Sequence, residues 1–112
     1  MTQRSSLYAG YIREREGFET LETDNAFATY RVSGNEIYIR DIYVDPIFRD
    51  ADLGRELADK VVLIGKKAGC EYLIGSVCPS ANGSDASLRL LQHYGMKLLR
   101  CTDNMIYFIK EI

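Results

Sequence analysis

A strand that leads directly into an amphipathic helix is the feature that most constrains how this chain can fold. Residues 37–44, I-Y-I-R-D-I-Y-V, are rich in β-branched and aromatic types and predict a strand. Pro46 ends this strand, because proline cannot donate to a sheet ladder. Apolar residues then recur at helical spacing and predict a helix over 52–68, with Asp52 as its N-cap and Gly69 as its left-handed end residue. Free N–H groups at such a helix start can bind phosphates.

Both faces of the predicted strand are largely apolar. Simple alternation places Ile37, Ile39, Asp41 and Tyr43 on one face and Tyr38, Arg40, Ile42 and Val44 on the other. Two apolar faces favour a central strand that is covered on both sides.

The remaining elements follow from periodicity and turn residues. A helix is predicted over 4–16, capped by Ser5 or Ser6 and ended by Gly17. Further strands are predicted over 18–23, 26–32, 72–77, 96–101 and 105–111. A last helix, over 84–94, is predicted to be capped by Ser84, with Ser87, Leu88, Leu91 and Tyr94 turned inward.

The order of these elements predicts the fold class. A strand, a helix and another strand in succession form a right-handed βαβ crossover, which makes the strands over 37–44 and 72–77 parallel. The other neighbours are joined by short turns and are expected to be antiparallel. We therefore expect an α/β (α+β) fold with a mixed, mostly antiparallel sheet, a central βαβ crossover and helices on both faces, in a single domain over 1–112.

Composition excludes several classes of function. The formal net charge is −2 and acidic and basic residues alternate along the chain, so no basic nucleic-acid surface is expected. No apolar run approaches the ~20 residues that a membrane span needs, and residues 1–8 do not resemble a signal peptide. These features predict a cytoplasmic protein. A chain of 112 residues has a small core, which a homodimer would enlarge.

The three cysteines do not predict a metal site. Cys70, Cys78 and Cys101 are widely spaced, which fits neither metal ligation nor a disulfide framework. We expect each to be a small buried thiol, and we expect no metal cofactor.

Two stretches of the sequence resemble the GNAT family of N-acetyltransferases. They are I-R-D-I-Y-V-D-P-x-F-R-x-x-x-L-G-R-E-L and, after an apolar strand, S-L-R-L-L-Q-H-Y-G-M-K. The resemblance covers roughly residues 26–111. It implies that acetyl-CoA is the co-substrate and that a loop of the form [R/Q]-x-x-G-x-[G/A] holds its pyrophosphate. The matching residues are Arg49, Asp50, Ala51, Asp52, Leu53 and Gly54.

The same resemblance implies roles for individual residues. The main chain of Ile42, Tyr43 and Val44 would contact pantetheine, in an opening between the strands that end at Val44 and Val77. The main-chain N–H groups of Ala51, Leu53, Gly54 and Arg55 would hold the pyrophosphate. Asp41 would be the general base for the acceptor amine, and desolvation beside an apolar strand would raise its pKa. From the residues alone, Asp41 is equally a partner for Arg40 or Arg31.

The loop departs from the family pattern at two aspartates. Asp52 replaces the first glycine, and Asp50 stands where a small residue is common. Each carboxylate would repel a nearby pyrophosphate by on the order of 1 kcal/mol. In addition, Asp52 as an N-cap would occupy the N–H groups that the phosphate needs.

The last helix departs from the pattern at the general acid. Many family members carry a tyrosine four residues before the glycine that ends this helix, and that position is Leu91 here. Tyr94 is the nearest phenol and is the candidate general acid, although a packed tyrosine is the alternative.

Two functions are therefore predicted. The first is acetyl-CoA-dependent transfer of an acetyl group to the amine of a small molecule or a protein. The second is a catalytically inactive GNAT-like binding or assembly module, of a compact kind that suits phage or mobile-element genomes.

Overall fold

The computed structural model describes residues 6–112, apart from the side chains of Asp50 and Ala51. The chain order of its elements is α1 (Leu7–Glu16), β1 (Glu19–Glu22), β2 (Ala26–Ser33), β3 (Glu36–Val44), the 3₁₀ helix η1 (Pro46–Ala51), α2 (Leu53–Lys67), β4 (Tyr72–Val77), α3 (Ser84–His93), β5 (Lys97–Thr102) and β6 (Met105–Glu111). The predicted order is confirmed, and the predicted loop after Pro46 contains η1.

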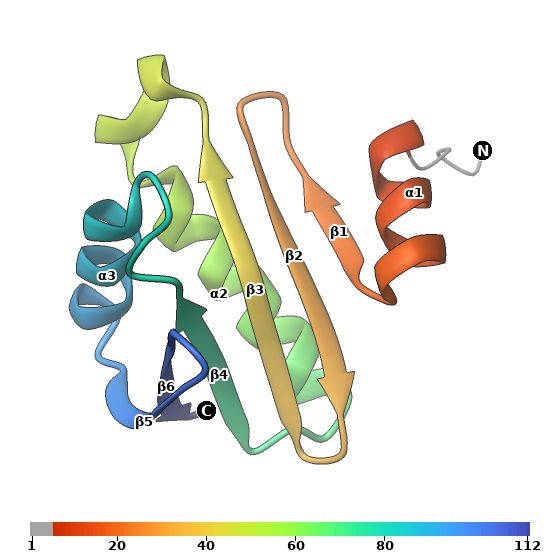
Figure 1. Ribbon diagram of the computed structural model, residues 1–112. Coiled ribbons are helices and arrows are strands. Elements are labelled where there is room, and N and C mark those ends of the chain that lie inside the picture. Colours follow the sequence, from red (N-terminus) through yellow and green to blue (C-terminus); the bar gives the residue numbers. More distant parts are fainter. Residues whose placement is uncertain (1–5) are drawn as a thin grey trace.

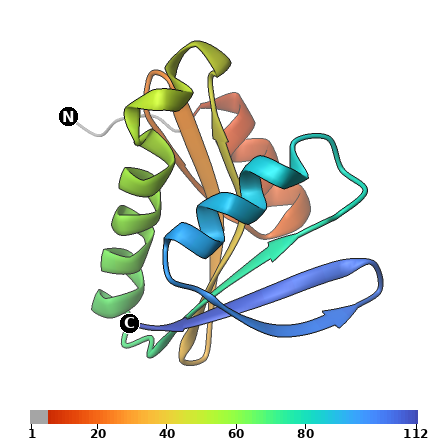
Figure 2. The same ribbon diagram turned by 90° about the vertical axis from the view of Figure 1, so that its left-hand side faces the viewer.

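The six strands form one sheet in the order β1-β2-β3-β4-β6-β5 (Figure 1). β3 and β4 are parallel and are joined by α2, whereas every other neighbouring pair is antiparallel. Figure 2 shows the sheet from its side, with α1 and α2 on opposite faces. The predicted fold class, with its mostly antiparallel sheet, its βαβ crossover and its helices on both faces, is confirmed.

The core lies between α2, α3 and the sheet. Ile37 and Leu73 of the parallel pair are fully buried beneath Leu57 and Val61 of α2. Gly65 of α2 lets helix and sheet approach closely, because a Cβ there would lie 2.7 Å from Ile37 Cγ2. α2 therefore packs closely against the face of β3.

The predicted caps of α1 are confirmed in part, whereas the predicted cap of α3 is wrong. Ser6 Oγ accepts from the Ala9 N–H at 3.0 Å and Gly17 ends α1 at φ 73°, as predicted, while Arg4 and Ser5 lie outside the described residues. The prediction that Ser84 caps α3 is wrong. Gly83 is the N-cap residue, and the Ser84 hydroxyl donates to the Pro79 carbonyl instead. Ser87, predicted to point inward, is exposed.

A β-bulge in β3 changes which residues share a face. Thr29 pairs with Asp41 and Tyr30 pairs with Ile39, so that Arg40 is an extra residue between two ladder pairs. Such a residue shifts the alternation of side chains by one position. The predicted division of β3 into two faces is therefore wrong beyond Arg40.

The residues after the bulge lie on the opposite faces from those predicted. Ile42 and Val44 join Ile37 and Ile39 against the core beneath α2. Tyr43 lies on the other face, where its ring centroid is 5.7 Å from that of Phe27. The bulge thus places Asp41 and Tyr43 together on the face that carries α1.

The cysteines differ from one another in burial. Cys70 is buried as predicted, Cys78 is half-buried, and Cys101 is exposed on the edge strand β5, so the prediction fails for Cys101. In residues 6–112, no group of acidic, histidine and cysteine side chains is placed to hold a metal ion. None of the helices described is long and apolar enough to cross a membrane.

Candidate functional site

The two parallel strands separate at the bulge. Pairs between β3 and β4 run from Glu36 and Tyr72 to Ile39 and Gly75, and in the described chain they go no further. β3 nevertheless continues to Val44 and β4 to Val77, and the two strand ends diverge in Figure 2, where β4 leans away from β3. Backbone groups on the facing edges are thereby left for another partner. The segment predicted to contact pantetheine, residues 42–44, is part of this edge.

Thr29 stabilises the bulge from the neighbouring strand. Its side chain is fully buried, its Oγ1 accepts from the Asp41 N–H at 3.1 Å, and its hydroxyl donates to Asp41 Oδ2 at 3.0 Å. The N–H group that the bulge removes from the regular ladder is satisfied in this way. Thr29 is not among the predicted site residues. A threonine opposite a carboxylate in neighbouring strands is the only sequence signal for it.

Asp41 is half-exposed and is part of an ion-pair network. Arg40 Nε lies 2.9 Å from Asp41 Oδ2, and Arg40 also contacts both carboxylate oxygens of Glu16 in α1. Burial lowers the pKa of Arg40, but the hydrogen bonds to Glu16 and Asp41 outweigh it and raise that pKa. The Asp41 side chain is 49% exposed, so the expected desolvation is not found. The ion pair that the sequence left open as the alternative is present.

Arg49 is fixed at the end of β3. Its Nε donates to the Val44 carbonyl at 3.0 Å, and its guanidinium lies 5.6 Å from the centre of the Tyr43 ring. A predicted loop residue and two predicted strand residues are therefore in contact. The side chains of Asp50 and Ala51, both predicted to take part in this loop, lie outside the described part of the chain.

Asp52, which replaces the first glycine of the [R/Q]-x-x-G-x-[G/A] loop, adopts a backbone conformation that suits glycine. Its φ is 57° and its ψ is 22°, the left-handed region that favours glycine and, among other residues, aspartate and asparagine. Side chains that cap a helix usually sit on extended backbone. Asp52 makes no side-chain capping bond, so the prediction that its carboxylate occupies the N–H groups of α2 is wrong.

Among the described side chains, none caps the N-terminus of α2. The Glu56 N–H donates to the Asp52 carbonyl at 3.1 Å, and the N–H groups of Leu53, Gly54 and Arg55 precede this first bond of the helix. The helix dipole adds partial positive charge at this end. Such a terminus attracts anionic groups.

Gly54 brings the start of α2 close to the open strand edge. A Cβ at this position would lie 3.3 Å from Leu90 Cδ2 of α3 and 3.7 Å from Ile42 Cγ2 of β3. A small residue is therefore needed where α2, α3 and β3 meet. The same contacts place the amide groups of α2 beside the diverging end of β3.

Tyr94 connects α3 to α2. Its hydroxyl donates to Asp59 Oδ1 at 2.6 Å, and burial, followed by this bond and the charge of Asp59, raises the pKa of Tyr94. Lys110 of β6 lies over the ring and donates to the Tyr94 carbonyl. Leu91 is buried, and its Cδ2 would lie 3.0 Å from a Cβ built at Gly75. These contacts favour the packing alternative for Tyr94.

Comparison with known proteins identifies the family of this chain. The sequence matches the profile of the acetyltransferase (GNAT) family over residues 8–96. No match is found among curated protein sequences.

Solved structures share the fold. The PaiA N-acetyltransferase from Thermoplasma acidophilum, determined in complex with coenzyme A, has a TM-score of 0.73 and 16% identity; the match covers 90% of this chain and 66% of that protein. Ard1 from Thermoplasma volcanium has a TM-score of 0.71 and 17% identity over 100% of this chain and 83% of its own. The ribosomal-protein-S18-alanine N-acetyltransferase from Escherichia coli has a TM-score of 0.68 and 21% identity, over 99% and 79%.

Proposed function

The chain belongs to the acetyltransferase (GNAT) family, and on this premise we propose that it transfers an acetyl group from acetyl-CoA to an amine. One observation carries the proposal. β3 and β4 separate after Ile39 and Gly75, and the start of α2 lies against the freed end of β3. The side chain of the N-cap residue Asp52 makes no hydrogen bond to this helix terminus. A strand edge that can pair with an amide chain thus lies beside a helix terminus that attracts phosphate.

The residues present fit acetyl-CoA, which would supply the activated acetyl thioester. Ile42, Tyr43 and Val44 would offer main-chain groups to the pantetheine arm. The N–H groups of Ala51, Leu53, Gly54 and Arg55 would hold the pyrophosphate. Arg49 supplies a positive charge at the same end of β3. The Asp52 carboxylate opposes binding, but it makes no hydrogen bond that closes the helix terminus.

Asp41 is the proposed general base. It is half-exposed and can be reached by an amine from solvent, and its Oδ2 is oriented by Thr29 and Arg40. It would accept the ammonium proton, directly or through water, before the amine attacks the acetyl carbonyl. N–H groups on the free edge of β3 would polarise that carbonyl. Nitrogen would then carry the acetyl group, and coenzyme A would leave as its thiolate without a covalent enzyme intermediate.

Protonation of the thiolate does not require Tyr94. The hydroxyl of Tyr94 is committed to Asp59 on α2, and its raised pKa makes it a weaker acid than a free tyrosine. A thiolate is a tolerable leaving group that water can protonate. We therefore propose that water protonates the thiolate. Tyr94 is the candidate side chain for this proton transfer, and a Tyr94→Phe variant tests whether it takes part.

The second candidate, an inactive binding or assembly module, is favoured by Leu91. This position, where the family resemblance implies a tyrosine, holds a buried leucine that packs toward Gly75. The two candidates differ in turnover. Coenzyme A release, followed with a thiol reagent in the presence of a panel of primary amines, tests the enzyme directly.

If the chain is an enzyme, coenzyme A release should depend on both acetyl-CoA and the amine, and its rate should fall in the Asp41→Asn variant. Binding of acetyl-CoA without amine-dependent release would support the inactive module. If Asp50→Gly with Asp52→Gly creates acetyl-CoA binding that the parent lacks, the parent is a non-enzymatic relative.

A further inference from the structure

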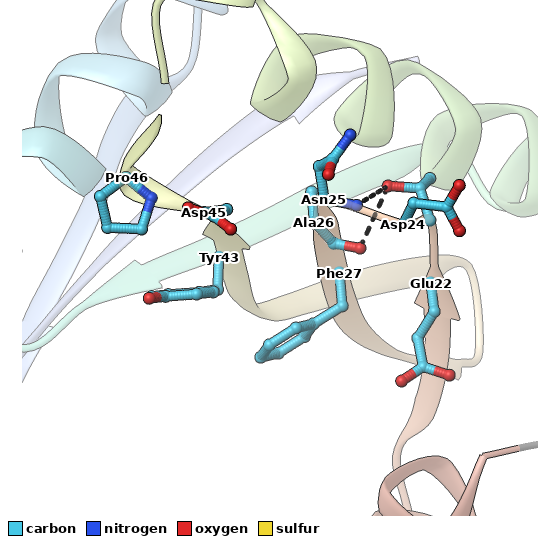
Figure 3. A pocket seen from close by; sticks show the side chains of 9 residues that line it. Glu22, Asp24, Asn25, Ala26, Phe27, Tyr43, Asp45 and Pro46 are labelled. Carbon is cyan, nitrogen blue, oxygen red and sulfur yellow. Dashed lines mark hydrogen bonds between the residues drawn. The ribbon is translucent and has the colours of Figure 1, made fainter. Parts of the chain in front are cut away.

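A cavity of about 310 Å³ lies beside the candidate site, where the turn between β1 and β2 meets the end of β3. Figure 3 shows the rings of Tyr43 and Phe27 and the side chain of Glu22 projecting to the same side of the sheet from three neighbouring strands. The volume is at the lower end of the range for small-molecule sites. The cavity is therefore large enough for part of a small ligand.

One wall of the cavity is aromatic. Phe27 packs against Tyr43 at 5.7 Å between ring centroids and against Tyr8 of α1 at 5.2 Å. Tyr43 is 47% exposed, although its ring is large and apolar. Such rings bind aliphatic chains by apolar contact and attract cations through their π-faces.

The charged side chains that line the cavity are acidic. Within the described part of the chain, its lining includes the acidic residues Glu22, Asp24 and Asp45 and no basic residue. In the described residues none of these three carboxylates forms an ion pair. Asp45 Oδ1 accepts from the Ile47 N–H, whereas Glu22 and Asp24 are exposed. Arg49 lies 5.6 Å from the centre of the Tyr43 ring, and its Nε donates to the Val44 carbonyl. The cavity is thus suited to a positively charged group.

The strand register relates this cavity to Asp41. Glu22, Phe27 and Tyr43 form one row of paired residues across β1, β2 and β3, and Thr20, Thr29 and Asp41 form the next row on the same face. Two strand spacings of about 4.8 Å and one two-residue step of about 6.8 Å separate the Cα atoms of Glu22 and Asp41 by roughly 12 Å.

Tyr8 of α1 packs on the aromatic wall through Phe27, and the charges of both Glu22 and Asp41 affect its pKa. Its pKa is raised first by burial and then by the negative charge of Asp41, with smaller contributions from Glu16 and Glu22, while Arg40 lowers it.

We propose that this cavity binds a second ammonium group of the acceptor, so that the acceptor is a linear aliphatic polyamine whose reacting amine lies at Asp41. This rests on the proposed acetyl transfer and names its substrate class. The methylene chain would lie over Phe27 and Tyr43, and the distal ammonium would be held between Glu22 and Asp24. Acceptors that carry a phosphate or carboxylate at the distal end would be repelled.

Matched acceptors test the proposal. Diaminooctane and octylamine have the same chain and differ in the distal ammonium group. We expect kcat/KM for acetylation to be at least about tenfold higher for diaminooctane, since one well-placed charge interaction is worth about 1.4 kcal/mol. In a Glu22→Gln, Asp24→Asn variant this preference should fall to near one. Glu71→Gln, the same chemical change at an exposed position immediately before β4, should leave it unchanged.

A binding measurement separates this proposal from the proposed function. Calorimetric titration of diaminooctane into the protein without acetyl-CoA requires no turnover. Binding that is weakened about tenfold in the double variant supports the polyamine site even if no acetyl transfer is found. Equal affinity for diaminooctane and octylamine, or binding that the double variant does not change, overturns the proposal whether or not acetyl transfer occurs.

Discussion

The Thr29 side chain and the Asp41 residue form a reciprocal pair of hydrogen bonds. The hydroxyl donates to Asp41 Oδ2 at 3.0 Å, and its oxygen accepts from the Asp41 N–H at 3.1 Å. The pair lies where the bulge at Arg40 ends the pairing between β3 and β4. A single buried hydroxyl thus stabilises the bulge, orients the proposed base and helps to create the free strand edge.

Thr29→Val is expected to lower the free energy of unfolding by about 1–3 kcal/mol, because the Asp41 N–H and Oδ2 would both lose their bonds to the fully buried Thr29 hydroxyl. Urea unfolding measures this change. Thr20→Val is the matched control, since Thr20 Oγ1 is buried without a hydrogen-bond partner in the described structure. Its removal should be neutral or stabilising. Equal destabilisation by the two variants would show that Thr29 acts by packing alone.

Asp52 variants separate backbone strain from charge. Asp52→Gly should raise the free energy of unfolding by about 0.5–1 kcal/mol, because glycine adopts the left-handed conformation without a steric cost but is more flexible when unfolded. Asp52→Asn should leave stability nearly unchanged, because asparagine also tolerates this conformation. Both variants should bind acetyl-CoA about fivefold more tightly, through the loss of about 1 kcal/mol of repulsion. A gain in Asp52→Gly alone would assign the effect to the backbone.

Tyr94→Phe is expected to lower the free energy of unfolding by about 0.5–1.5 kcal/mol near neutral pH, because the solvent-exposed hydrogen bond to the Asp59 carboxylate is lost. The folded state raises the pKa of Tyr94 above its ordinary value of 10.0, so it binds this proton more tightly than the unfolded state does. The stability difference from the parent should be complete below pH 10 and shrink as the pH rises above it. Tyr11→Phe, at an exposed position, is the control and should show no such difference.

The same variant tests the general acid. If Tyr94 is a packing residue, kcat should change by less than about threefold in Tyr94→Phe. A loss of about 10²-fold or more, with unchanged KM, would assign Tyr94 to the chemistry.

Asp41→Asn is expected to lower kcat/KM by about 10²–10⁴-fold while the affinity for acetyl-CoA stays the same. Steady-state kinetics and calorimetry measure the two effects. If the Asp41→Asn variant retained its activity, Asp41 would be an ion-pair partner of Arg40 and not the general base.

The sequence was sufficient for the element order, because each element has strong periodicity and clear end signals. Pro46 and Gly69 mark the ends of β3 and α2, and the turn at Gly34 joins β2 to β3. The parallel relation of β3 and β4 follows from the helix between them. These are local and topological rules that a single sequence carries.

The bulge could not be predicted, since Arg40 is neither glycine nor proline and lies in an unbroken strand pattern. Its position depends on the partner strand, where Thr29 supplies the compensating bonds. The predicted faces of Asp41 and Tyr43 are therefore wrong. For the same reason, the sequence does not predict the cavity beside Phe27. The prediction that the Asp52 carboxylate caps α2 fails for a related reason. Its residue type indicates a cap, whereas its left-handed backbone decides how the side chain acts.

Calorimetric titration of acetyl-CoA into the protein tests most directly whether the open edge of β3 and the start of α2 form an acyl-CoA site. We expect saturable binding of one acetyl-CoA per chain with a Kd below about 1 mM, strengthened in Asp52→Asn. No saturable heat and no thermal shift at millimolar acetyl-CoA, for both the parent and Asp52→Asn, would contradict it.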